Sequence, residues 1–291
     1  MKKSLLLGAH VSVAGGVYTA PERGKKIGAD VIQIFSKHNT RWQSKALSEE
    51  DARAFREETV RTQVKTAAIH CAYLINLGSD KEAVRTRSLY ALEDEASRAA
   101  MLGVPYIVMH PGSSGNDPEQ MGIKRISSAL CSFGSFPSGV TLLLENTAGQ
   151  GNSIGRSMRQ LRELVDGAGN PPDIAVCLDS AHLFESGYNI GEKEGWSAFI
   201  EEVNEFGILP LVRMWHLNDS KTAAGSRVDR HEHIGRGKIS PWGFHRILTH
   251  DEFSKLPMVL ETPKDGDDEF EMDIVNLAEL RKLADHPPEK E

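Results

Sequence analysis

The chain contains two apolar runs that end in an acidic side chain, TLLLE at residues 141–145 and IAVCLD at residues 174–179. Short segments that are apolar throughout are typical of strands covered on both faces of a parallel sheet. Six more segments have a similar form: LLLGAH (5–10), VIQIFS (31–36), TAAIH (66–70), VPYIVMH (104–110), RMWH (213–216) and MVLE (258–261). The sequence therefore predicts eight strands.

Helical patterns lie between these strands, for example at residues 47–61, 83–102 and 157–169. Strands that alternate with helices indicate βαβ units and a parallel sheet. Eight such units without a linker predict a single (β/α)8 TIM barrel at residues 1–285, followed by a solvated tail at residues 286–291. A doubly wound open sheet is the structural alternative.

Seven of the eight predicted strands end in a histidine or a carboxylate: His10, His70, His110, Glu145, Asp179, His216 and Glu261. Only the second strand ends otherwise. With 41 acidic residues and 11 histidines in 291 residues, chance would supply far fewer such endings. A closed barrel gathers the carboxyl ends of its strands on one face, where barrel enzymes do their chemistry. The pattern therefore predicts a metal centre on that rim.

The formal net charge is -7, whereas proteins that bind nucleic acid usually have a basic surface. Three bound divalent cations would leave a charge of about -1, so the net charge does not exclude a phosphodiester substrate. The three cysteines are odd in number and widely spaced, which argues against a disulfide framework. No long apolar run or cleavable leader is recognisable, and we expect a cytoplasmic protein without a membrane span.

The predicted ligands fall into groups along the rim. His70, His110 and Glu145 end successive strands, and two imidazoles with one carboxylate suit zinc. Asp179, His216 and Glu261 form a more acidic group with Glu145, which is placed to bridge two ions. Two ions that share a carboxylate suit in-line displacement at phosphorus.

A third group is expected near the long polar segment at residues 218–241, because loops of this length are usually functional or disordered. One helical turn separates His182 from Asp179. Asp229 and His231 are two residues apart, so in an extended segment their side chains share a side. His182, Asp229 and His231 could hold a third metal, although His233 offers the same register as His231.

Four further histidines and two lysines are expected to have simpler roles. His10 is expected to orient a ligand or a water molecule. Lys37 and Lys221 could contact phosphate groups. Structural roles are expected for three other histidines: His38, His245 and His250.

Five blocks of the sequence carry a family resemblance: GAHVSVAGG (8–16), LLLENTAGQGNSIG (142–155), CLDSAHLFESGYNI (177–190), WHLNDSK (215–221) and VDRHEHIGRG (228–237). Together they resemble the endonuclease IV family of apurinic/apyrimidinic endonucleases, over residues 7–263. The resemblance implies a trinuclear zinc phosphodiesterase that repairs double-stranded DNA. Such enzymes cut 5′ to an abasic site, leave a 3′-hydroxyl and trim blocked 3′ ends.

Carried over by motif, the resemblance implies the same three ligand groups, with Glu145 bridging the first two zinc ions. Manganese or iron could occupy some positions. Glu261 is the carboxylate expected to steer or deprotonate the attacking water, so Glu261 and Glu145 are the predicted catalytic residues. A rim that grips DNA suits a monomer.

Damage recognition is expected from Arg41 and Trp42, after the second strand, and from Tyr73, after the third. Trp42 could instead anchor its own loop. Two segments depart from the family pattern: Arg41 directly precedes Trp42, and the usual Gly-Glu-Gly reads Gly235-Arg236-Gly237. These departures concern Arg41 and the 235–237 segment and leave the predicted metal ligands unchanged.

Two other functions fit parts of the pattern. A sugar isomerase or epimerase on a metal-bearing barrel would use the six ligands of the first two groups but needs no third ion. A non-catalytic protein that binds abasic DNA would keep its metals for structure.

Overall fold

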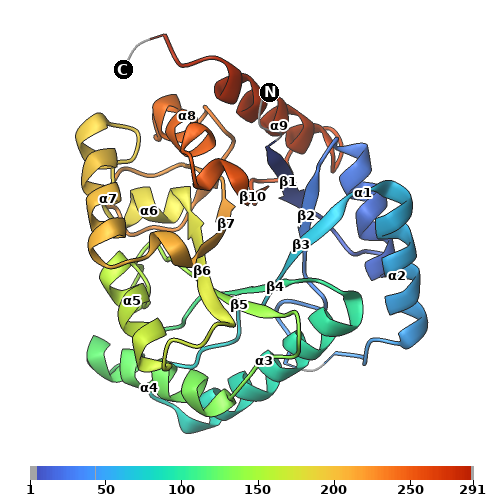
Figure 1. The fold of residues 1–291 in the computed structure, drawn as a ribbon, viewed down its shortest axis with the longest axis vertical. Coiled ribbons are helices and arrows are strands. Elements are labelled where there is room, and N and C mark those ends of the chain that lie inside the picture. Colours follow the sequence, from blue (N-terminus) through green and yellow to red (C-terminus); the bar gives the residue numbers. More distant parts are fainter. Residues whose placement is uncertain (1–4, 43, 290–291) are drawn as a thin grey trace.

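The computed structural model describes residues 5–42 and 44–289, and in it eight parallel strands form a closed barrel surrounded by helices (Figure 1). The strand order is β1-β10-β7-β6-β5-β4-β3-β2, and β1 pairs with both β10 and β2. The barrel strands are β1 (Leu6–His10), β2 (Val31–Ile34), β3 (Lys65–His70), β4 (Tyr106–Met109), β5 (Thr141–Glu145), β6 (Ile174–Asp179), β7 (Val212–His216) and β10 (Pro257–Leu260). The predicted TIM barrel is confirmed, and an open sheet is excluded.

The helices are α1 (Ala20–Lys26), α2 (Glu49–Thr62), α3 (Glu82–Leu102), α4 (Glu119–Phe133), α5 (Met158–Gly167), α6 (Ser180–Ser186), α7 (Lys193–Glu205), α8 (Pro241–Thr249) and α9 (Glu271–Asp285). Helix α2 begins after Ser48, whose hydroxyl oxygen accepts a hydrogen bond from the Asp51 amide and so satisfies one free N–H group of the first turn. The long polar segment after β7 contains a small antiparallel hairpin of β8 (Asp219–Ser220) and β9 (His231–Glu232).

The core has two layers because side chains alternate along each strand. One set packs between the strands and the helices, and a second cluster fills the barrel interior: Val31, Ala67, Ala68, Val108, Leu143, Ala175, Cys177, Met214 and Val259. With a period of two, the residue two positions after an interior residue points to the same side. Seven residues near the rim follow this rule: Gln33, His70, His110, Glu145, Asp179, His216 and Glu261.

Candidate metal centre

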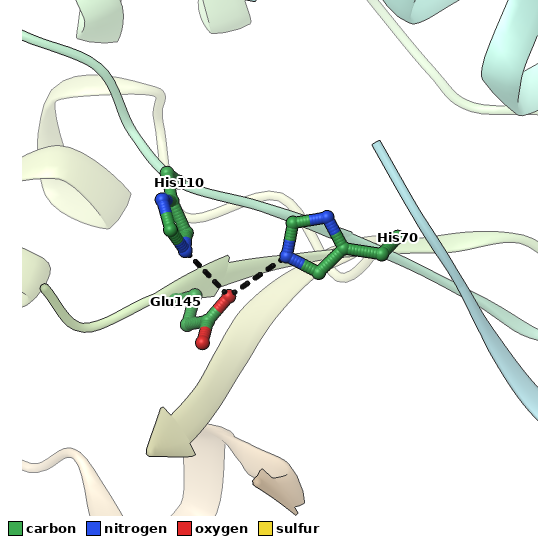
Figure 2. A group of neighbouring side chains, drawn as sticks. All are labelled: His70, His110 and Glu145. Carbon is green, nitrogen blue, oxygen red and sulfur yellow. Dashed lines mark hydrogen bonds and ion pairs between the residues drawn. The ribbon is translucent and has the colours of Figure 1, made fainter. Parts of the chain in front are cut away.

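Glu145, at the end of β5, is fully buried and lies between two sets of imidazoles. Its Oε2 atom lies 3.1 Å from His110 Nε2 and 3.2 Å from His70 Nε2. Figure 2 shows both imidazoles directed at this oxygen. Its Oε1 atom lies 2.8 Å from His216 Nδ1. Each carboxylate oxygen therefore faces a different group, which is the arrangement required of a bridging ligand.

The second group surrounds the Oε1 side of Glu145. The ligand atoms of Glu145, Asp179, His216 and Glu261 all lie within 4.8 Å of one another. Strand pairing produces part of this arrangement, because Asp179 is in register with His216 across β6 and β7. Asn218 then holds Asp179 by donating from Nδ2 to Oδ2 over 2.6 Å.

The third group forms where the start of α6 meets the hairpin. Asp179 caps the helix, and its Oδ1 atom accepts from the His182 amide over 2.8 Å. His182 Nε2 lies 3.4 Å from Asp229 Oδ2, and His231 Nε2 lies 3.6 Å from Asp229 Oδ1. Three candidate ligand atoms also lie within 4.8 Å of one another, one each from Asp179, His182 and His231. Asp179 therefore borders both the second and the third group.

The structure places the two neighbouring histidines of the hairpin differently. His231 directs Nε2 toward Asp179 and Asp229. In contrast, His233 Nε2 lies 2.7 Å from Asp265 Oδ1, and its Nδ1 lies 3.0 Å from the amide nitrogen of Asn276. Since both ring nitrogens of His233 have partners elsewhere, only His231 of this pair joins the group.

Two buried carboxylates hold the hairpin in place. Asp219 accepts hydrogen bonds from the amides of Gly235, Gly237 and Ile239, each over 3.0 Å. Glu185 Oε1, on α6, accepts from the Ser220 hydroxyl over 2.6 Å and from the Arg230 amide over 3.1 Å.

Arg236 joins the same turn through its backbone, because its N–H donates to the His233 carbonyl over 2.9 Å. Its side chain is exposed. The departure at Gly235-Arg236-Gly237 therefore leaves the backbone contacts of the turn in place.

Hydrogen bonding shows why cations fit this cluster. The Nδ1 atoms of His70 and His182 lie 2.8 Å and 2.9 Å from the backbone carbonyls of Cys71 and Asn146. A carbonyl can only accept, so Nδ1 carries the proton and the Nε2 lone pair faces carboxylate oxygens. His231 follows the same pattern, with Nδ1 at 3.2 Å from the Glu261 carbonyl.

Two acceptors that face each other need a proton or a metal ion between them. His231 Nε2 is buried and has no hydrogen-bond partner among the described residues. Ligands placed about 2.0–2.1 Å from a tetrahedral zinc ion lie roughly 3.3 Å apart, close to the separations around Glu145. The donor set therefore fits zinc-sized cations.

In the metal-free protein, neighbouring charges shift the pKa values of His182, His216 and Glu145. Burial alone lowers the pKa of the His182 imidazole, but Asp179 and Asp229 outweigh it and raise that pKa well above its ordinary value. Burial likewise lowers the pKa of His216, whereas the surrounding acidic groups raise it well above the ordinary value. For Glu145 burial raises the pKa, but His216 and His110 lower it well below the usual range, so the carboxylate stays ionised.

One buried residue of the cluster, Gln33 on β2, was not among the predicted site residues. Its amide nitrogen donates to Glu261 Oε1 over 2.6 Å and lies 3.1 Å from His10 Nδ1. His10 Nδ1 also lies 3.6 Å from Glu261 Oε1, so His10 borders a candidate ligand. The alternation along β2 from the interior residue Val31 could have identified Gln33 as an inward-facing side chain.

The residues proposed for DNA contact lie in two separate hollows. Tyr73 and Lys221 line a cleft of ≈ 640 Å³ together with His70, His110, His182, Asp229, His231 and Glu261. Arg41 and Trp42 line a different hollow of ≈ 940 Å³, beside Arg87 and Tyr90 of α3. Trp42 is half-buried and packs against the core, as the anchoring interpretation predicts, whereas Arg41 is exposed.

The expectation that Lys37 contacts phosphate is wrong. Its side chain is only 2% exposed, and Nζ lies 2.5 Å from Asp94 Oδ2 and 3.5 Å from Glu95 Oε1. Removal of a lysine from water requires such partners. Two of the histidines expected to be structural contact residues away from the metal centre. His245 Nδ1 lies 2.7 Å from the Leu283 carbonyl, and the ring of His250 stacks on that of Phe253.

Two further sequence expectations concern the whole chain. All three cysteines are free thiols. Within residues 5–42 and 44–289, no helix has the length and apolar character needed to cross a membrane.

Comparisons with known proteins identify the family. Residues 21–284 match the family described as xylose isomerase-like TIM barrel. A protein named probable endonuclease 4 from Geobacter sulfurreducens is 42% identical over 289 residues, which cover 98% of this chain and 96% of that protein.

Two solved structures share the fold of this chain, but only one of them is also clearly similar in sequence. The crystal structure of endonuclease IV from Thermus thermophilus superposes with a TM-score of 0.82 at 34% identity, covering 96% of this chain and 98% of that one. A D-psicose 3-epimerase structure, with a TM-score of 0.68 at 17% identity, covers 96% of each chain and shares the fold alone. Because the Geobacter protein and the Thermus enzyme are 42% and 34% identical to it over almost its whole length, the chain belongs to the endonuclease IV family.

Proposed function

We propose that this protein is a metal-dependent phosphodiesterase of DNA repair that cuts 5′ to abasic sites, leaves a 3′-hydroxyl and removes 3′ blocking groups. Family membership supports the class of reaction, a hydrolytic nuclease that acts on DNA. The observation that carries the proposal is Glu145, whose two oxygens face two separate imidazole groups at 3.1 Å and 2.8 Å. Adjacent cation sites that share a carboxylate suit displacement at a phosphodiester.

Three zinc ions per chain are proposed, with manganese possible in some sites. His70, His110 and Glu145 would hold the first, and Glu145, Asp179, His216 and Glu261 the second. His182, Asp229 and His231 would hold the third, with Asp179 at its border. When bound, such ions act as Lewis acids that polarise a phosphoryl oxygen and make water more acidic.

Glu261 is the proposed proton acceptor. Its side chain is 13% exposed and lines the cleft, so substrate and water can reach it. Gln33 Nε2 donates a hydrogen bond to Glu261 Oε1, and Glu261 Oε2 lies 3.3 Å from His216 Nδ1. Burial raises the pKa of Glu261, but His216 and His10 lower it well below the usual range, so the carboxylate is ionised at neutral pH in the metal-free protein.

The proposed partner is double-stranded DNA with an abasic site or a blocked 3′ end. Tyr73 is 57% exposed at the mouth of the cleft, and its ring lies 5.4 Å from that of His70. An exposed ring there can stack on a nucleotide next to the lesion. Arg41, Trp42 and Lys221 are proposed to contact the flanking duplex. A monomer in the cytoplasm completes the proposal.

The sugar isomerase alternative is not favoured, because the hairpin that brings Asp229 and His231 to the rim adds a third group of ligands. The epimerase structures share only the fold with this chain.

The proposal is tested with a duplex that contains one tetrahydrofuran site, incubated with the purified protein with and without a chelator. We expect nicking 5′ to the lesion, loss of nicking with chelator, and recovery when zinc is restored. Tight binding without a nick would instead identify a non-catalytic binder. Isomerisation of a ketose without any nick would favour the sugar enzyme.

A further inference from the structure

We infer that Gln33 is a positioning residue: its single amide group orients His216 and Glu261 toward the second metal site. This inference rests on the proposed function. Gln33 lies on β2, is fully buried and touches residues from three other strands or strand ends. Its Oε1 atom lies 2.9 Å from His216 Nε2, and its Nε2 atom lies 2.6 Å from Glu261 Oε1 and 3.1 Å from His10 Nδ1.

The orientation of this amide is determined by its surroundings. Glu261 Oε1 is a carboxylate oxygen and can only accept, so the NH2 group must face it. The opposite orientation would press the amide oxygen of Gln33 against the carboxylate. Both N–H groups of Gln33 are therefore used, one for Glu261 and one for His10, and the carbonyl oxygen is left for His216.

The carbonyl oxygen of Gln33 fixes which nitrogen of His216 faces the metal site. Because that oxygen can only accept, His216 carries a proton on Nε2. Its Nδ1 lone pair then points at the carboxylates of Glu145 and Glu261, 2.8 Å and 3.3 Å away. Three other candidate ligands, His70, His182 and His231, use backbone carbonyls for this purpose, whereas His216 depends on a side chain.

A glutamine combines functions that no close substitute retains. Methionine fills a similar volume but makes none of these three hydrogen bonds. Glutamate can accept from His216 but repels Glu261. Removal of a residue that hydrogen-bonds to a metal ligand typically lowers metal affinity or activity about 10- to 100-fold.

The test compares Gln33→Met and Gln33→Glu with the unaltered protein and with Gln160→Met. Gln160 is a matched control because it is also buried and its Oε1 accepts from two amides, those of Gly155 and Arg156, but it hydrogen-bonds no candidate ligand. Zinc affinity is measured by chelator competition, and the His216 Nε2–H signal by ¹⁵N–¹H spectra of the zinc-loaded protein. The signal is assigned by its loss in His216→Gln.

We expect Gln33→Met to bind one zinc equivalent about 10- to 100-fold more weakly and to lose its slowly exchanging Nε2–H signal. Gln33→Glu should keep that signal but also bind zinc more weakly, because Glu261 is repelled. Gln160→Met should lower the melting temperature while zinc affinity and the signal stay unchanged.

The inference is overturned if Gln33→Met binds zinc like the unaltered protein and retains the Nε2–H signal. If Gln33→Met does not fold, Gln33→Glu decides: unchanged zinc affinity rejects the role. An unaltered protein that binds no zinc and does not nick abasic DNA would refute the proposed function itself, which is a different result from the failure of Gln33 alone.

Discussion

The strand-end ligands and the hairpin ligands reach the same rim by different physical means. Glu145, Asp179 and His216 are fully buried and lie at the ends of hydrogen-bonded strands. The side chains of Asp229 and His231, on or beside the hairpin, are 31% and 16% exposed. The barrel positions the first set, whereas a few polar contacts position the second. The strand-end part of the centre should therefore be rigid, and the hairpin part should respond to changes in its supports.

The largest effect is expected at Glu145, where the strand-end groups meet. Glu145→Gln keeps the shape but removes the charge that both groups share. Several kcal/mol of lost stabilisation corresponds to about 10³-fold or more in kcat. Nicking rates and zinc content measured together check this prediction. A variant with normal zinc content and near-normal nicking would show that Glu145 does not bridge.

The second prediction separates the two histidines of the hairpin segment. His231→Ala should lose one zinc equivalent and about 10²-fold of nicking activity, because Nε2 points into the third group. His233→Ala should keep the zinc content, but loss of its contacts with Asp265 and Asn276 should lower the free energy of unfolding by about 1–3 kcal/mol. Zinc analysis and denaturant unfolding of both variants provide the measurement. The reverse pattern would assign the site to His233.

The third prediction loosens the hairpin without touching a ligand. Glu185→Gln weakens the contacts with Ser220 and the Arg230 amide, and should reduce affinity for the third zinc about 10- to 100-fold. Affinity for the other two ions should remain unchanged because the barrel strands hold their ligands. Stepwise chelator titration distinguishes the three ions. Equal weakening of all three would mean that the two parts of the centre are not independent.

The smallest effect is a change of stability with pH. The pKa values of His70, His182 and His216 are raised in the metal-free protein. Below the unfolded pKa, near 6.5, these groups contribute their full stabilisation. This contribution is lost as the pH rises through the higher pKa of the folded protein.

From about pH 8 down to about 6.5, the metal-free protein should therefore gain stability. Zinc must displace the same protons, so zinc affinity should fall over that range, by up to about tenfold per pH unit for each proton displaced. Thermal unfolding with and without zinc at several pH values checks both trends. Parallel curves would contradict the assignment of these histidines as ligands.

Much of the strand-end half of the centre was predictable because two local rules act together. Apolar segments bounded by helices indicated the strands, and each strand's last inward-facing residue came from its alternation. Gln33 follows the same alternation, but an uncharged side chain does not indicate a ligand. Its contacts with His216 and Glu261 depend on the tertiary structure, which brings β2, β7 and the end of β10 together around one amide.

The hairpin half depended on the tertiary structure. Sequence spacing placed both His231 and His233 on one side of an extended segment, and no local rule separates them. Asp265 and Asn276, from later parts of the chain, occupy both nitrogens of His233. Lys37 is a similar case, since only the position of α3 beside it shows that its charge is paired with Asp94 and Glu95.

The barrel and the side chains at its strand ends follow from the sequence, because hydrophobic periodicity and strand polarity are local properties of the chain. Three outcomes follow from the packed structure instead: which histidine of the hairpin faces the centre, which lysine is buried, and which uncharged residue orients the ligands. Those outcomes depend on partners that are distant in sequence, and polar atoms removed from water must find them.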